Sequence, residues 1–177
     1  MPQNAGDHQR ALDSVLRSAT NVPADTWNRP AAEGKWSPAQ VVEHLRLTYT
    51  TIRADLAGRE GFRIRLGWLQ LKLVRWRFLA AITREGRFPP GTPAVREVRP
   101  GPGPYDREQL LAQLKAEGEA FDQEIHAASA SGRLLNHPFL GKLTIDEGLA
   151  LVTQHLRHHE RQLPAAGDQA SAPASAC

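Results

Sequence analysis

Apolar residues recur at helical spacing along most of the chain. Within residues 8–19 they fall at i, i+3, i+4 and i+7, and Asp7 is placed to cap the first turn. Residues 38–57 carry a second apolar stripe, and they follow Ser37, a residue type that caps helices, with Pro38 at the first helical position. The pattern therefore predicts helices over 8–19 and 38–57.

Three further segments have the same period. Residues 106–131 place six apolar or small residues on one face, and residues 144–163 begin with a Thr144–Glu147 capping box. Residues 62–82 form an additional helical segment. Its expected buried stripe is Leu66, Leu69, Leu73, Trp76 and Ala80.

The segments between these helices contain no strand pair, internal repeat or glycine-rich phosphate loop that the pattern can identify. Residues 88–105 hold six prolines, which neither a helix nor a central strand accommodates, so they form a long connection. We expect an all-α protein, a four-helix bundle with a long crossover and one extra helical segment. Residues 1–163 should form a single domain, and 164–177 should be a disordered tail.

Composition and charge exclude several classes of protein. The 177 residues carry 22 Lys and Arg against 19 Asp and Glu, so the net charge of +3 is too small to indicate nucleic-acid binding by itself. The single cysteine, Cys177, excludes an intramolecular disulfide and a cysteine-rich zinc module. No segment has the roughly 18 apolar residues of a spanning helix or the apolar core of a signal peptide. We expect a soluble, cytoplasmic protein.

Three of the seven histidines lie on apolar helix faces. His44 lies on or beside the stripe of its helix, and His155 and His159 are i, i+4 neighbours that should reach one divalent ion together. Three protein ligands leave a coordination position for water or substrate, as in catalytic metal sites. Without a cysteine ligand, zinc, nickel, iron and manganese all remain open. Gln162, three residues after His159, can orient a ligand.

The spacing alone also permits three hydrogen-bonded core histidines that bind no metal. His8, His126, His137 and His158 have no distinctive position in the pattern. Glu43 and Glu160 adjoin the three histidines in sequence, but a helix turns about 100° per residue, so each should face elsewhere. No Ser-His-Asp or Cys-His set is evident, and the catalytic residues stay unassigned.

Three motifs of the chain resemble those of the DinB-like (YfiT-like) family of metal-dependent enzymes. Trp36-Ser37-Pro38-Ala39-Gln40-Val41-Val42-Glu43-His44-Leu45 is similar to the family's WSxxE/QxxxHL signature, and His155-xxx-His159-xx-Gln162-Leu163 to its closing HxxxHxxQ helix. His137-Pro138-Phe139-Leu140-Gly141-Lys142-Leu143-Thr144 resembles the HPxxGxLT entry of one branch. The likeness spans roughly residues 8 to 163.

The resemblance implies a metal bound by His44, His155 and His159 at one end of a four-helix bundle. It also implies a small-molecule substrate and transferase, isomerase or hydrolase chemistry, with a low-molecular-weight thiol as a possible cofactor. Two departures bear on packing and substrate: Gly148 stands where relatives often have a large aromatic residue, and the stretch 61–104 is long, basic and proline-rich.

Within residues 63–77, five basic residues interleave with two tryptophans: Arg63, Arg65, Lys72, Arg75 and Arg77, with Trp68 and Trp76. The sequence favours a helix whose apolar stripe packs on the bundle while the basic residues project into solvent. A homodimer interface, an anionic membrane surface and nucleic acid are the alternative partners. They belong to a second functional hypothesis, a non-catalytic binding protein. The proline-rich run is either a spacer or a lid beside the metal end.

Overall fold

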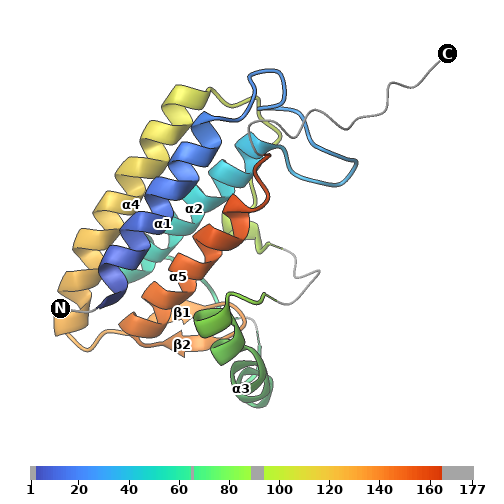
Figure 1. Cartoon of the computed structure of the whole chain (residues 1–177). Helices are drawn as coiled ribbons and strands as arrows, with labels where there is room; N and C mark the ends of the chain where they lie inside the picture. Colours follow the sequence, from blue (N-terminus) through green and yellow to red (C-terminus); the bar gives the residue numbers. More distant parts are fainter. Residues whose placement is uncertain (1–2, 65, 89–93, 165–177) are drawn as a thin grey trace.

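The structure is a computed structural model that describes residues 3–64, 66–88 and 94–164. Four long helices form a bundle in which α2 packs on α4 and α1 on α5 (Figure 1). The elements are α1 (Gln3–Thr20), α2 (Pro38–Leu56), α3 (Trp68–Glu85), the 3₁₀ helix η1 (Arg96–Val98), α4 (Arg107–Ala130), β1 (Leu135–His137), β2 (Gly141–Leu143) and α5 (Ile145–Glu160). The all-α fold expected from the sequence is confirmed.

The chain direction explains the long crossover. In Figure 1, α1 and α5 run toward one end of the bundle, whereas α2 and α4 run together toward the other. Because α2 and α4 are parallel neighbours, residues 57–106 must return along the whole bundle before α4 begins. This return places η1 beside α2 and places α3 across the end of the bundle that carries the hairpin.

The cap signals set the start of the helices that carry the histidines. Ser37 accepts from the Gln40 backbone amide, and the Gln40 side chain accepts from the Ser37 backbone amide. Thr144 and Glu147 form the equivalent capping box of α5. Both caps were expected.

The start of α1 differs from the prediction. The helix begins at Gln3, so Asp7 lies inside it and does not cap it; its carboxylate pairs with Arg10 one turn later. Residues 3–6 contain no proline, and the helix therefore extends one turn beyond the apolar stripe.

The expectation of no strand pair was wrong. Strands β1 and β2 form a short antiparallel hairpin in which Leu135 pairs with Leu143 and His137 with Gly141. Each strand has three residues, too few to show an alternating pattern. Local contacts define the hairpin instead. His137 Nδ1 accepts from the amides of Phe139 and Leu140, and Gly141 adopts a positive φ of 74°.

The hairpin also accounts for Gly148. A Cβ added to this buried α5 residue would lie 2.4 Å from Cδ1 of Leu135 on β1. Leu135 thus occupies the space that a larger residue at position 148 would need. The side chain of this β1 residue therefore packs closely on α5.

The predicted orientation of α3 was also wrong. Leu69, Leu73, Trp76 and Ala80 of the expected buried stripe face solvent. The opposite face carries the contacts with the rest of the protein, through Leu71, Val74, Phe78, Leu79 and Ile82. Because α3 is apolar on both faces, periodicity alone could not decide which face is buried.

Candidate metal centre

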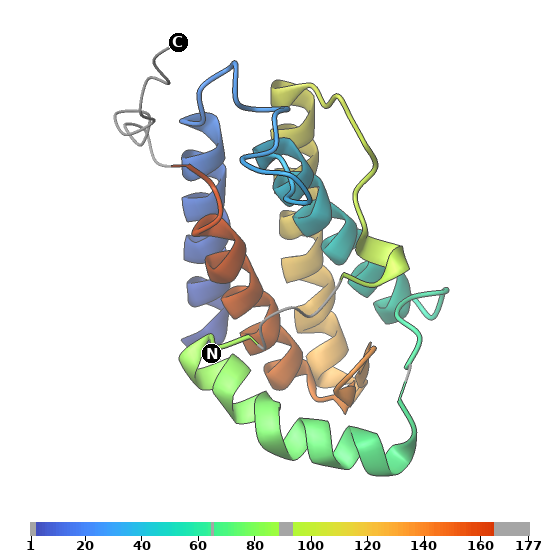
Figure 2. The same cartoon turned by 90° about the vertical axis from the view of Figure 1, so that its right-hand side faces the viewer.

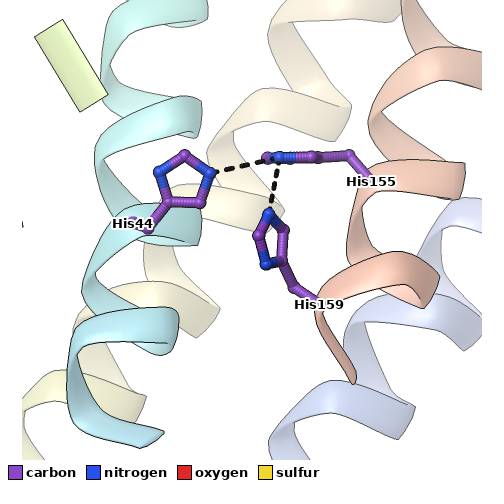
Figure 3. A group of neighbouring side chains, drawn as sticks. All are labelled: His44, His155 and His159. Carbon is purple, nitrogen blue, oxygen red and sulfur yellow. Dashed lines mark hydrogen bonds between the residues drawn. The ribbon is translucent and has the colours of Figure 1, made fainter. Parts of the chain in front are cut away.

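Three histidines from two helices converge at one point of the bundle core (Figure 3). His44 comes from α2, and His155 and His159 come from successive turns of α5. Nε2 of His155 lies 3.2 Å from Nε2 of His44 and 3.0 Å from Nε2 of His159. The inward orientation expected for the three side chains is what the structure has: His44 and His159 are buried, and His155 is partly buried.

Hydrogen-bond partners of Nδ1 fix the ring orientation of two of these histidines. Nδ1 of His44 lies 2.7 Å from the carbonyl oxygen of Val98, and Nδ1 of His159 lies 2.9 Å from Oε1 of Gln162. Since both partners accept, each Nδ1 carries the proton and each Nε2 presents a lone pair toward His155. Gln162 is thus hydrogen-bonded to His159.

This arrangement fits a divalent metal ion. Nitrogen ligands about 2.0–2.1 Å from a tetrahedral zinc ion lie about 3.3 Å apart, close to the two shorter spacings here. The three ligand atoms all lie within 4.8 Å of one another. Metal-binding histidines usually donate their other N–H to a carbonyl or a similar acceptor, as His44 and His159 do.

Burial keeps the three imidazoles neutral. It lowers the pKa of His44, lowers that of His159 to about 3, and holds that of His155 well below its usual value. The neighbouring histidines lower the pKa values further when they are protonated. Neutral imidazole is the form that binds metal, so the three side chains can bind a cation at neutral pH without first losing a proton.

Aromatic rings surround the cluster. The Trp36 ring lies 4.9 Å from that of His44, between ring centroids, and 6.4 Å from that of His159. Phe88, just after α3, lies 5.9 Å from His155. Together they place apolar rings beside the cluster.

The other groups that adjoin the cluster in sequence have different partners. Glu43 is buried and forms a two-point ion pair with Arg46, with both distances 2.7 Å. Glu160 accepts from Ser14 and Ser18 of α1. His158 is partly buried against Phe88. Among the described residues, it does not belong to the group that could hold a metal ion.

Several residues around the site could not be assigned from the pattern. The crossover contributes Val98 and Phe88, and the loop before α2 contributes Trp36. The part of the proline-rich run that contains Val98 therefore contacts a histidine of the cluster. Residues 89–93 of this run are outside the described residues.

A second polar group is buried in the bundle core. His8 has no exposed surface; its Nε2 lies 2.6 Å from the Tyr49 hydroxyl and its Nδ1 2.7 Å from Oδ1 of Asp122. The sequence carried a signal for this burial, because His8 extends the apolar stripe of α1 back by one turn from Leu12.

Fold and site together define a four-helix bundle protein whose three-histidine cluster can hold a divalent metal ion. The comparison with known families agrees with this class. The sequence model of the DinB superfamily matches residues 7–163, and the chain belongs to that superfamily. No curated protein and no solved structure matches the chain. None of the described helices is both long and apolar enough to span a bilayer.

Proposed function

We propose that this protein is a metal-dependent enzyme that acts on a small molecule, with His44, His155 and His159 as the metal ligands. The observation that carries the proposal is the convergence of three Nε2 atoms, two of which are aimed by partners on Nδ1. Three protein ligands are the usual number in a catalytic site, because one position stays open for a reactant.

The family resemblance, together with the three-histidine ligand set, suggests the reaction class. A divalent ion bound here lowers the pKa of a thiol or water at its open position, so that the anion forms near neutral pH. We favour transfer or isomerisation that uses a low-molecular-weight thiol, and hydrolysis is the alternative. Val98 and Gln162 hold two of the histidines in place, and Trp36 and Phe88 place apolar rings beside the cluster.

Metal content of the protein purified without a histidine tag tests the ligand assignment. His44→Ala, His155→Ala and His159→Ala should each lose most of the bound zinc, nickel, iron or manganese. His126→Ala is the control, since it removes an exposed imidazole of α4 outside the cluster. Full occupancy in His44→Ala, or equal loss in His126→Ala, would place the site elsewhere.

Cobalt loading separates the two reaction classes. Addition of cysteine or another small thiol to the Co²⁺-loaded protein should produce thiolate-to-cobalt charge-transfer absorption, and His155→Ala should abolish it. Hydrolysis of ester or amide substrates without this absorption would favour the hydrolase. A wild-type protein that takes up none of these metals would contradict both.

A further inference from the structure

The solvent-facing side of α3 is an apolar surface away from the histidine cluster. Helix α3 crosses the end of the bundle that carries the hairpin (Figures 1 and 2). Four large side chains on this outer face are mostly open to solvent: Trp68 at 71%, Leu69 at 66%, Leu73 at 64% and Trp76 at 79%. We call these four residues the outer face of α3.

The inner side of α3 holds the helix in place. Arg75 makes a two-point ion pair with Glu147 at 2.6 and 2.8 Å and donates to the Lys142 carbonyl at 3.0 Å. Leu71 approaches Gly141 of β2, and Ile82 is buried. Arg75 therefore belongs to the packing contacts, contrary to the expectation that it projects into solvent. The outer face is thus presented by a fixed helix.

Basic residues lie on the outer face and beside it. Lys72, Arg77 and Arg84 are exposed, and none forms an ion pair with an acidic residue within the described part of the chain. The one acidic residue of α3, Glu85, pairs with Arg87. Among the described residues, the surface thus combines exposed apolar side chains with unpaired cations, and no acidic side chain of the helix is unpaired.

We propose that the outer face of α3 binds the surface of an anionic lipid bilayer, with the helix parallel to the membrane plane. Tryptophan prefers the level of the lipid headgroups, where its ring is buried and its indole N–H stays hydrated. Leu69 and Leu73 would enter the acyl boundary, and the cations of α3 would contact lipid phosphates. Because α3 crosses the end of the bundle, it can lie on a flat surface (Figure 2).

Charge and area disfavour a second copy of the chain as the occupant. A two-fold contact through α3 would bring the cations of one copy close to the same cations of the other copy. The four side chains expose on the order of 500 Å² of apolar surface if each tryptophan offers roughly 200 Å². A stable protein interface covers about 800 Å² on each partner.

The geometry also disfavours nucleic acid. Base stacking needs an open aromatic face, and the Lys72 ammonium, 5.0 Å from the centroid of the Trp68 ring, already occupies one face of that ring. Leu69 and Leu73, in the middle of the surface, offer nothing to a phosphate backbone.

Vesicle binding at low salt tests the proposal on the full chain. The protein should cosediment with phosphatidylcholine vesicles that contain one third phosphatidylglycerol, and bind pure phosphatidylcholine at least tenfold more weakly. Its tryptophan emission should shift to the blue on binding, and a Trp68→Phe, Trp76→Phe variant should lose the shift while Trp27 and Trp36 remain. Added salt should weaken binding, because it screens the cations.

Two surface variants separate the contributions. Replacing the four outer-face residues by Ser, or reversing the charge in Lys72→Glu, Arg77→Glu and Arg84→Glu, should each reduce binding at least tenfold without changing helix content. The matched control reverses one lysine and two arginines that are exposed elsewhere: Arg17→Glu, Lys35→Glu and Arg59→Glu. It makes the same change in net charge and should retain most of the binding.

Three results would overturn the proposal. The first is no binding to anionic vesicles at low salt, and the second is equal loss in the control variant. The third is a different occupant: a dimer in analytical ultracentrifugation that the four Ser substitutions dissociate, or tight binding to an oligonucleotide that they abolish.

Discussion

His44 donates from Nδ1 to the backbone carbonyl of Val98 over 2.7 Å, so the crossover connection fixes the tautomer of a candidate metal ligand. Val98 lies in η1, 54 residues further along the chain, and its own side chain is buried. The connection is therefore part of the site. It supports His44 in the way that Gln162 supports His159.

Gln162→Ala tests this support directly. The substitution removes the acceptor 2.9 Å from Nδ1 of His159 and should weaken zinc binding about 10- to 100-fold, the usual effect of losing such a partner. Gln162 is exposed, so the free energy of unfolding of the metal-free protein should change by less than about 0.5 kcal/mol. Competition with a chelator of known affinity measures the binding.

Two further variants control this measurement. Gln162→Glu keeps an acceptor oxygen and should retain most of the affinity, whereas Gln113→Ala removes an exposed glutamine of α4 and should have no effect. Equal affinity of Gln162→Ala and wild type would show that Gln162 does not position His159.

The three clustered histidines were predictable because each lies on the apolar face of a strongly periodic helix. His155 and His159 are one turn apart, and the caps at Ser37 and Thr144 set the start of α2 and α5. Local sequence therefore determines which way these side chains point. Their meeting point depends on α2 and α5 belonging to one bundle, which the family resemblance implied.

The remaining features depend on contacts between distant segments. Val98 reaches His44 only because η1 packs on α2, and no periodicity marks a 3₁₀ turn in a proline-rich run. Both faces of α3 are apolar, so packing against α5 and the hairpin decided which is buried. In the same way, Leu135 explains Gly148 only after the hairpin is known.

Tyr49→Phe should destabilise the protein through His8. Burial raises the pKa of Tyr49 well above its usual value, so the hydroxyl stays protonated and donates to Nε2 of His8 over 2.6 Å. Loss of the hydroxyl leaves a buried acceptor without a partner, which costs about 1–3 kcal/mol. Urea denaturation measures the change in the free energy of unfolding.

A double-mutant cycle supplies the control. His8→Leu combined with Tyr49→Phe removes both polar partners, so the double variant should lose less stability than the two single variants added together. Strictly additive losses would mean that the hydroxyl and the imidazole do not interact.

Chelation should leave the bundle folded. The hydrophobic core runs through α1, α2, α4, α5 and the hairpin, and it does not depend on an ion. Metal removal should lower the midpoint of thermal unfolding by mass action but leave the far-ultraviolet circular dichroism at 25 °C helical. Loss of the helical signal on chelation would show that the metal is structural.

The stability of the metal-free protein should fall as the pH is lowered from about 6.5 to about 4, in part because of His137. Burial lowers the pKa of His137 to about 4. At a pH between about 4 and 6.5, His137 is protonated in the unfolded chain but stays neutral in the folded hairpin. The neutral His137 therefore adds to the free energy of unfolding by at most about 3 kcal/mol, and this contribution is complete above a pH of about 6.5. His44, His155 and His159 act in the same direction.

His137→Asn isolates the contribution of this residue. An Asn side-chain oxygen can still accept from the amides of Phe139 and Leu140, so the hairpin should persist without a titrating group. In urea denaturation across this pH range, the free energy of unfolding should fall less steeply for His137→Asn than for wild type, and the two slopes should agree above pH 7. Parallel curves down to pH 4 would show that His137 does not titrate with folding.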